Sequence, residues 1–478
     1  MTVVRRGWLH LASGAGVGRV LGFASNLLLS RWLGPGELGL FNLVTTTVQT
    51  SDTLVRCGAD YALNFELGGQ PEASKTERGV QLARGLAQLC SLMTVFICVA
   101  VSIWVWWGQG LFPHGLVGSQ RFILTSLLLL MIACEGSSAS AWEVLLVSHR
   151  TAPLALRQGL FFPLRLLFAG VGSLLSGVVG AMAGWSLVAV AQSVWLKIVL
   201  RHLWNPLQIF PPLWASLRQL LKRGFPFYAA NLLASLIFYP LLLKVANVSG
   251  LSEIGYLRVG QILQQLFAFL PATLVPVLFL RLRSESSFAN QVIVMEKPLR
   301  VIWLVLLEVL LLYCLFDQSL IIWLFGADFV SALMPTRLLL TTALFECLAQ
   351  LVIQPLLAAG KTRLYGFWQN GAALFAASLG WLWIPTAGLA AYLIVRLLYV
   401  IVPLIAFGAP VFHQLHEPRK MLSLVLASVA LLGFCLIQAL TDLNLFWMPS
   451  VFLVAFVTVL VLHRQDLLLI RNMLRGTA

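Results

Sequence analysis

Fourteen segments of about 20 mostly apolar residues follow one another along the sequence, separated by short polar connections. A helix of about 20 residues crosses the roughly 30 Å hydrocarbon core of a bilayer. In lipid, every backbone amide and carbonyl must be hydrogen-bonded within the protein, so spans of this length are helical. The sequence therefore predicts an all-α polytopic membrane protein with about 14 transmembrane helices. The predicted spans are 8–33, 38–63, 82–106, 122–147, 153–175, 178–200, 225–246, 254–280, 299–316, 338–359, 364–384, 387–407, 421–440 and 445–462.

Composition excludes several classes of soluble protein. Hydrophobic residues make up 59% of the chain and charged residues 10%, and no soluble core needs so much apolar sequence. The net charge of +14 is not arranged as a nucleic-acid-binding surface, since no zinc-finger spacing and no aromatic-basic sheet pattern occurs. The seven cysteines form no C-x-x-C pair, so we predict neither a disulfide framework nor a metal site, and we expect no cofactor.

The basic residues predict the orientation of the chain. Most of the 32 lysines and arginines fall in connections on the side of the N-terminus. The opposite side has only Arg31, Arg121, Arg258 and Arg337. Because cytoplasmic loops carry the excess of Lys and Arg, both termini are predicted to be cytoplasmic. Arg5 and Arg6 precede an apolar run as in a signal peptide, but that run is too long and contains Arg19, so we expect it to be a permanent span.

The two halves of the chain resemble one another. Residues 33–43 (LGPGELGLFNL) align with 249–259 (SGLSEIGYLRV) at an offset of 216, and 145–159 resembles 356–371 with one gap. The matches occur in the same order in both halves, which predicts two pseudo-symmetric six-helix bundles with two helices appended. Such a pair of repeats is typical of alternating-access transporters. The predicted domains are 1–200 (first bundle), 201–224 (a cytoplasmic amphipathic linker), 225–407 (second bundle) and 408–478 (two further helices and a short tail).

One polar stripe runs along the second predicted span. Its members recur at steps of three or four and fall within roughly 80° of a helix at about 100° per residue. They are Asn42, Thr45, Gln49, Asp52, Arg56 and Asp60. Charged groups inside a membrane are rare and cost about 2.5–3.5 kcal/mol each on insertion scales, so the stripe indicates a functional site. The alternative is a set of ion pairs that only determines how the helices pack.

The first span adds Arg19 and Asn26 to this candidate site. Gly14, Gly18 and Gly22 lie beside them at helical spacing. Small residues in such a row let another backbone approach closely. We therefore expect a neighbouring segment to pack against this row.

Further candidates lie in other spans. Arg258, Gln261 and Gln265 share a side of the eighth span, and a predicted cationic cavity is completed by Arg165, Lys244 and Arg396. Clustered arginines can bind phosphate through bidentate hydrogen bonds, although Arg258 and Lys244 could instead extend to the membrane interface. The intramembrane acids are candidates for charge pairing or for ion coupling, and they are Asp52, Asp60, Glu135, Glu143, Glu308 and Glu346.

Two motifs that suggest enzymes are incomplete. Gly360-Lys361-Thr362 resembles the end of a phosphate-binding loop, but Pro355 stands where that loop needs glycine. His413, His416 and Glu417 lack the order of a zinc protease motif. We therefore predict that the protein is not an enzyme.

Four stretches resemble the polysaccharide-export branch of the MATE-like multidrug/oligosaccharidyl-lipid/polysaccharide (MOP) flippase superfamily. They are residues 11–44, 321–339, 356–373 and 384–398. The motifs that carry the resemblance are the Arg19 and Leu33-Gly34 context, the Leu324-Phe325-Gly326 turn and the Gly360-Lys361-Thr362-Arg363 loop.

This resemblance implies that the chain moves an undecaprenyl-pyrophosphate-linked oligosaccharide across the bacterial inner membrane, for lipopolysaccharide O-antigen, capsule or exopolysaccharide assembly. Implied partners are this substrate, membrane lipids and other polysaccharide-assembly proteins, with no nucleic acid. Arg19 and Arg56 would correspond in role to the family's cationic cavity, although Arg56 aligns with no family motif. We expect these two arginines to take the pyrophosphate. We expect sugar to be hydrogen-bonded by Asn42, Gln49, Gln261 and Gln265.

Two other functions compete with this interpretation. A cation-coupled exporter of small organic molecules would have the same fold with a narrower, more acidic cavity. A membrane glycosyltransferase or polymerase would need a large external loop with catalytic carboxylates or histidines, and the predicted outer loops are short.

Overall fold

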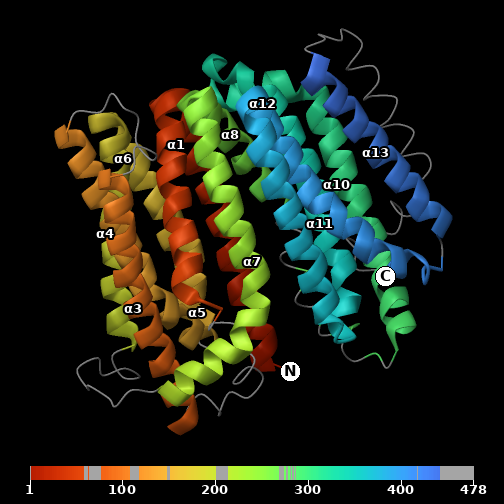
Figure 1. Cartoon of the computed structure of the whole chain (residues 1–478), viewed down its shortest axis with the longest axis horizontal. Coiled ribbons are helices and arrows are strands. Elements are labelled where there is room, and N and C mark those ends of the chain that lie inside the picture. The colour runs from red at the N-terminus through yellow and green to blue at the C-terminus, as the bar shows by residue number, and fades with distance from the viewer. Residues whose placement is uncertain are drawn as a thin grey trace. The chain divides into compact units, whose positions relative to one another are not determined.

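Long helices joined by short connections make up the computed structural model of the chain (Figure 1). It describes residues 2–58, 63, 77–107, 118–147, 151–200, 214–268, 274–275, 278–279, 281–282, 285, 287–416 and 418–441. Strands are absent from these residues, so the all-α prediction is confirmed. Within them, seven helices are long and apolar enough to cross a membrane by length and composition. The chain is a multi-pass membrane protein.

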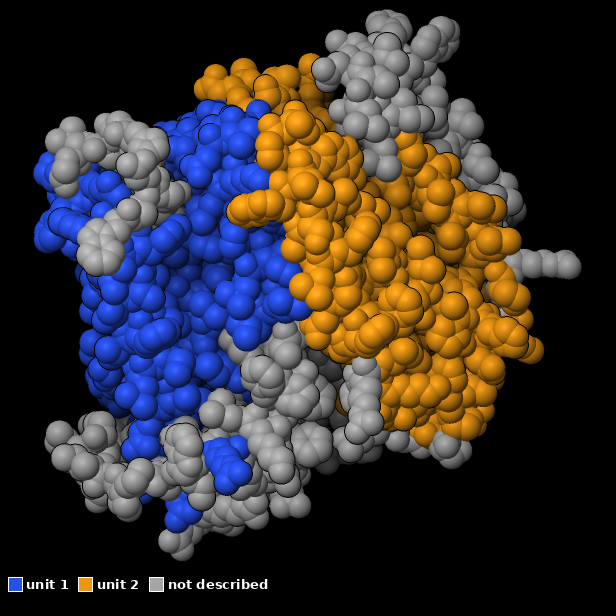
Figure 2. Space-filling view, viewed as in Figure 1, with its two compact units in different colours: residues 1–255 blue, residues 256–478 orange. Residues whose placement is uncertain are grey.

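The chain divides into two compact units (Figure 2). Unit 1 comprises residues 1–255 and unit 2 comprises residues 256–478. The boundary between the units follows residue 255, whereas the sequence predicted a boundary at the linker 201–224. The helix that follows the linker therefore belongs to unit 1. The predicted division into six-helix bundles stays a prediction.

Unit 1 is built around its first helix, α1, which packs against α3, α4 and α6. Its helices are α1 (Thr2–Arg56), α3 (Glu77–Trp107), α4 (Gly118–Val147), α5 (Thr151–Leu156), the π-helix η2 (Arg157–Phe161), α6 (Phe162–Leu200), α7 (Trp214–Ser249) and the first residues of α8 (Leu251–Phe267).

In unit 2, α11 packs against both α10 and α12. The helices of this unit are the remainder of α8, α10 (Phe288–Phe325), the 3₁₀-helix η3 (Ala327–Ala332), α11 (Leu333–Ala358), α12 (Thr362–Phe412) and α13 (Pro418–Thr441). A hydrogen bond of 2.9 Å from Trp303 Nε1 to Ser428 Oγ joins α10 to α13.

Three of the longest helices each consist of two arms separated by a break. The breaks lie at Gly34 in α1, at Ser176 and Gly177 in α6, and at Gly388 in α12. Each of these glycines has a positive φ, a conformation that costs a side-chain-bearing residue roughly 1–2 kcal/mol. The breaks fall in, or within two residues of, connections that the apolar pattern predicts. Thirteen predicted spans thus coincide, at least in part, with a helix or helix arm, and 445–462 lies outside the described residues.

Helices α7 and α10 extend well beyond their predicted spans. The amphipathic stretch at 214–223 is continuous with the following span, because α7 already begins at Trp214. Helix α10 begins at Phe288, before Pro298 and the predicted start at 299, and it runs on to Phe325. Proline is tolerated inside membrane helices because neighbouring groups satisfy the backbone atoms that it leaves free.

Candidate functional site

The polar stripe lies on the second arm of α1, after the break at Gly34. Asn42 is buried, and its Nδ2 donates to the carbonyl oxygen of Ile254 at 3.5 Å. Gln49, two turns further along, is exposed, and Asp52 and Arg56 are partly buried. Asp60 lies outside the described residues. The stripe therefore passes from a buried end near Asn42 to a partly exposed end at Arg56.

Arg56 is held between two carboxylates from different helices. Its Nε donates to Asp52 Oδ2 on α1 at 3.1 Å, and its Nη1 donates to Glu143 Oε1 on α4 at 2.8 Å. Asp52, a candidate for charge pairing, lies four residues before Arg56 on the same helix, whereas Glu143 is a partner from another helix. The side chains of Asp52, Arg56 and Glu143 are 27%, 17% and 14% exposed, so this triad is partly accessible.

A second, more deeply buried group joins α4 to α6. Arg165 Nη1 donates to Glu135 Oε1, and Arg165 Nη2 donates to Gln192 Oε1 at 2.7 Å. All three residues are buried. Arg157, in η2, places Nη2 3.9 Å from the other oxygen of Glu135.

Unit 1 thus contains a cluster of three carboxylates and three arginines within its membrane helices. Five of its members are residues predicted for the cavity or for charge pairing: Asp52, Arg56, Glu135, Glu143 and Arg165. Arg157 was missed, because the orientation rule counts it with the loops on the side of the N-terminus. The one signal for it in the sequence is its position only eight residues before Arg165.

The first arm of α1 packs closely on η2, as its glycines predict. A Cβ atom added at Gly18 would lie 1.9 Å from the carbonyl oxygen of Gln158, and one at Gly22 would lie 3.1 Å from the ring of Phe162. Arg19, beside Gly18, is half-buried. Asn26 is buried, and its Nδ2 donates to the carbonyl oxygen of Gly22 at 2.9 Å. The small-residue row therefore brings the Arg19 backbone close to the segment that carries Arg157.

A reciprocal contact joins the second arm of α1 to the beginning of α8. An added Cβ at Gly39 would lie 1.9 Å from the carbonyl oxygen of Leu251, and one at Gly255 would lie 2.0 Å from that of Pro35. At the repeat offset of 216, Gly39 matches Gly255 and Pro35 matches Leu251. Reciprocal contacts of this kind are what a two-fold relation between repeats produces. The division of the chain into two repeats stays a prediction.

Unit 2 has its own ion-pair group on α8, α11 and α12. Glu346 Oε1 accepts from Arg396 Nη2 at 3.2 Å, and its Oε2 accepts from Gln264 Nε2 at 2.8 Å. Of the two predicted glutamines, Gln261 is half-buried and Gln265 is exposed, and their neighbour Gln264 contacts Glu346.

Three further candidates lie in α7, α8 and α10. Arg258 is buried, and Lys244, which belongs to unit 1, is half-buried. Glu308 in α10 is only 9% exposed, and neither of its carboxylate oxygens has a hydrogen-bond partner among the described residues.

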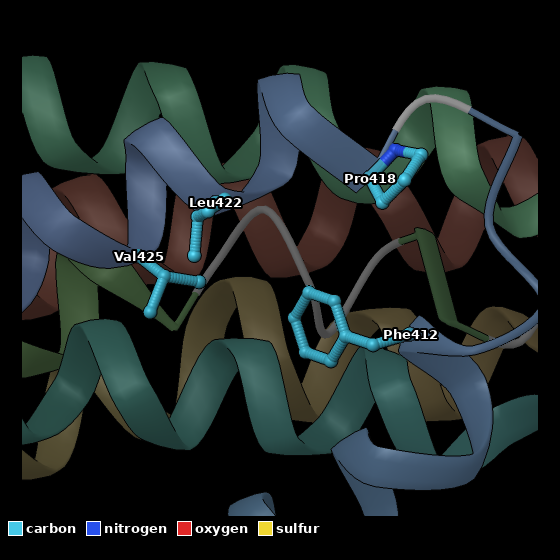
Figure 3. Close-up of a pocket in the computed structure, with 4 residues that line it drawn as sticks. All are labelled: Phe412, Pro418, Leu422 and Val425. Carbon is cyan, nitrogen blue, oxygen red and sulfur yellow. The ribbon is translucent and has the colours of Figure 1, made fainter.

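One cavity of about 410 Å³ lies in unit 2 between the end of α12 and the start of α13 (Figure 3). It is lined by Phe412, Pro418, Leu422 and Val425. All four side chains are apolar, so this cavity is not suited to a charged or sugar headgroup.

Comparisons with solved structures identify the fold. The lipid II flippase MurJ, in an inward closed conformation, matches with a TM-score of 0.70 and 13% identity over 95% of this chain and 99% of that chain. An outward-facing multidrug resistance MATE transporter of the MOP superfamily matches with a TM-score of 0.58 and 14% identity over 89% and 96%. A MOP superfamily transporter from Pyrococcus furiosus has a TM-score of 0.57 and 15% identity over 85% and 96%.

No model of a protein family matches the sequence, and no curated protein matches it. The likeness at 13–15% identity is therefore one of fold. The chain has the fold shared by the flippase MurJ and the MATE transporters of the MOP superfamily.

Proposed function

We propose that this protein flips a polyprenyl-pyrophosphate-linked oligosaccharide across the bacterial inner membrane by alternating access, with both termini in the cytoplasm. Its place would be in the assembly of a surface polysaccharide. The observation that carries the proposal is the partly exposed Asp52–Arg56–Glu143 triad on a polar helix face, in a chain with the fold of a lipid II flippase.

The chemistry of the substrate fits such a site. A sugar pyrophosphate cannot cross hydrocarbon unaided, whereas its lipid tail can stay in the bilayer. A guanidinium pre-oriented by two carboxylates presents its remaining N–H groups to a phosphate in a planar arrangement. Arg19 and Arg56 are the residues we propose for the pyrophosphate, and Asn42, Gln49, Gln261 and Gln265 those for sugar.

The contact between α1 and α8 is where we propose that helices move during alternating access. Glycines at Gly39 and Gly255 let two backbones meet with no side chain between them. If the repeats rock about a two-fold axis, this reciprocal contact closes in one state and separates in the other.

The likeness to MATE multidrug resistance transporters favours a second candidate, a cation-coupled exporter of small organic molecules. Glu308, buried without a described hydrogen-bond partner, would suit such coupling. Drug sensitivity with intact surface polysaccharide after deletion would favour this exporter over the flippase.

Deletion in the native host tests the proposal directly. We expect lipid-linked oligosaccharide to accumulate on the cytoplasmic face and the surface polymer to be lost. The wild-type gene should remove the accumulated intermediate and restore the polymer. Normal surface polymer with no accumulated intermediate would contradict the proposal.

A further inference from the structure

Arg157 differs from the other two arginines of the unit 1 cluster in how its charge is satisfied. Arg56 donates to two carboxylates, and Arg165 donates to a carboxylate and an amide. The nearest carboxylate oxygen to Arg157 is Glu135 Oε2 at 3.9 Å, beyond the roughly 2.7–3.2 Å of a hydrogen bond. Within the described part of the chain, its guanidinium therefore has a nearby opposite charge but no hydrogen-bond acceptor.

Arg157 is also the most accessible member of the cluster. Its side chain is 31% exposed, against 11% for Glu135 and 8% for Arg165. It lies within Coulombic range of Asp52 and Arg56, so it belongs to the same electrostatic site as the triad.

The guanidinium is nevertheless held in position. Its Cζ lies 4.4 Å from the centroid of the Trp142 ring, a cation–π contact. Trp142 is itself buried in a cluster with Leu145, Leu196 and Leu200. A guanidinium stacked on an aromatic face keeps its N–H edge available for a planar acceptor.

The backbone around Arg157 has an unusual form. Phe162 N–H bonds to the carbonyl oxygen of Arg157, which closes a π-helical turn over Arg157–Phe161. Single π-turns inside α-helices occur frequently at functional sites. Gly18 packs on the carbonyl of Gln158, so this turn and the segment that carries Arg19 lie together.

We infer that Arg157 is an additional anion-binding residue of unit 1, with a phosphate or pyrophosphate group as its ligand. The inference rests on the proposed function, in which that group belongs to the lipid-linked substrate. Glu135 partly balances the charge of Arg157, and the Trp142 ring orients its guanidinium. Its N–H groups donate no hydrogen bond within the described part of the chain, so they are available to an anion. A membrane phospholipid headgroup shares the same chemistry and is the other source of such a ligand.

The test is equilibrium binding of farnesyl pyrophosphate to the purified full chain in neutral lipid nanodiscs. We expect Arg157→Gln to weaken binding about tenfold or more, and Arg157→Lys, which keeps the charge but loses the planar donor edge, to weaken it less. Arg218→Gln is the matched control, because Arg218 is an exposed arginine in α7 of the same unit, and its affinity should equal that of wild type.

The outcomes separate the inference from the function on which it rests. Wild-type affinity in Arg157→Gln would overturn the inference and leave the proposed function standing. No binding of farnesyl pyrophosphate by wild type would overturn both. If phosphatidylglycerol in the nanodisc removes the difference between wild type and Arg157→Gln, then Arg157 binds membrane headgroups and the substrate role is overturned. Should Arg157→Gln not fold, as judged by gel filtration, wild-type affinity in Arg157→Lys would count against the inference.

Discussion

Arg165 shows how this membrane protein accommodates a buried charge. Two of its nitrogen atoms donate hydrogen bonds, one to Glu135 and one to Gln192. All three side chains, which come from α4 and α6, are buried. The attraction within such a pair offsets the cost of removing both charges from water only while both partners remain. The pair therefore contributes more to the unique packing of these helices than to a large net free energy.

Removing one partner alone should be costly. Arg165→Gln leaves Glu135 as a buried carboxylate without its pair, which costs roughly 3–5 kcal/mol. We expect a clear fall in the melting temperature of the detergent-solubilised protein. The double variant Arg165→Gln with Glu135→Gln should recover much of the loss. Equal melting temperatures for wild type and Arg165→Gln would show that the pair does not stabilise the fold.

Pairing within one helix was predictable and pairing between helices was not. Asp52 and Arg56 are four residues apart, which puts them on one helix face. Glu143 and Gln192 come from other helices, and no spacing in the sequence reports which helix lies opposite. For the same reason no spacing in the sequence predicts that Gln264 on α8 donates to Glu346 on α11.

At the scale of elements, the crossing of α1 and α8 depends on two glycines. Gly39 and Gly255 each face a backbone carbonyl at a distance that leaves no room for a side chain. Close backbone approach through small residues is a general means of joining membrane helices, because lipid supplies no hydrophobic force between them. Bulk at either glycine would therefore push the two helices apart.

We expect Gly39→Val to lower the melting temperature and to reduce transport, since overpacking of this kind costs about 1–3 kcal/mol. Gly366→Ala is the control, because Gly366 lies within α12 and a Cβ there meets no atom within 4 Å. Alanine at that position should be tolerated or slightly stabilising, since it favours helix over glycine. Gly39→Val with wild-type stability and transport would show that the crossing is not close.

The positions of elements were predicted better than their lengths. Apolar segments and their turn glycines identified the breaks at Gly34 and Gly177, because both signals are local. The continuation of α7 back to Trp214 and of α10 through Pro298 depends on tertiary surroundings that the sequence pattern does not contain.

At the scale of the whole molecule, the distribution of basic residues predicts which connections face the cytoplasm. A charge bias of this kind orients short loops, since positively charged loops are retained on the cytoplasmic side. The connection at 148–150 should face the cytoplasm and the connection at 108–117 the opposite side.

Cysteine labelling checks that topology. In a variant without native cysteines, we expect Gly115→Cys to react with a membrane-impermeant maleimide in intact spheroplasts. Ser148→Cys should react only after the membrane is permeabilised. The reverse pattern would invert the orientation and would place the proposed pyrophosphate site on a path that starts outside the cell.

The central claim is that Arg56, held between Asp52 and Glu143, binds the pyrophosphate of a lipid-linked sugar during transport. Transport in proteoliposomes is its most direct test. Purified protein is reconstituted with a fluorescent polyprenyl-pyrophosphate oligosaccharide, and its transfer between leaflets is followed with a membrane-impermeant quencher. We predict rapid transfer with wild type, and transfer no faster than in protein-free vesicles with Arg56→Ala at equal protein content. Equal rates for wild type and Arg56→Ala, or no transfer with either, would contradict the account.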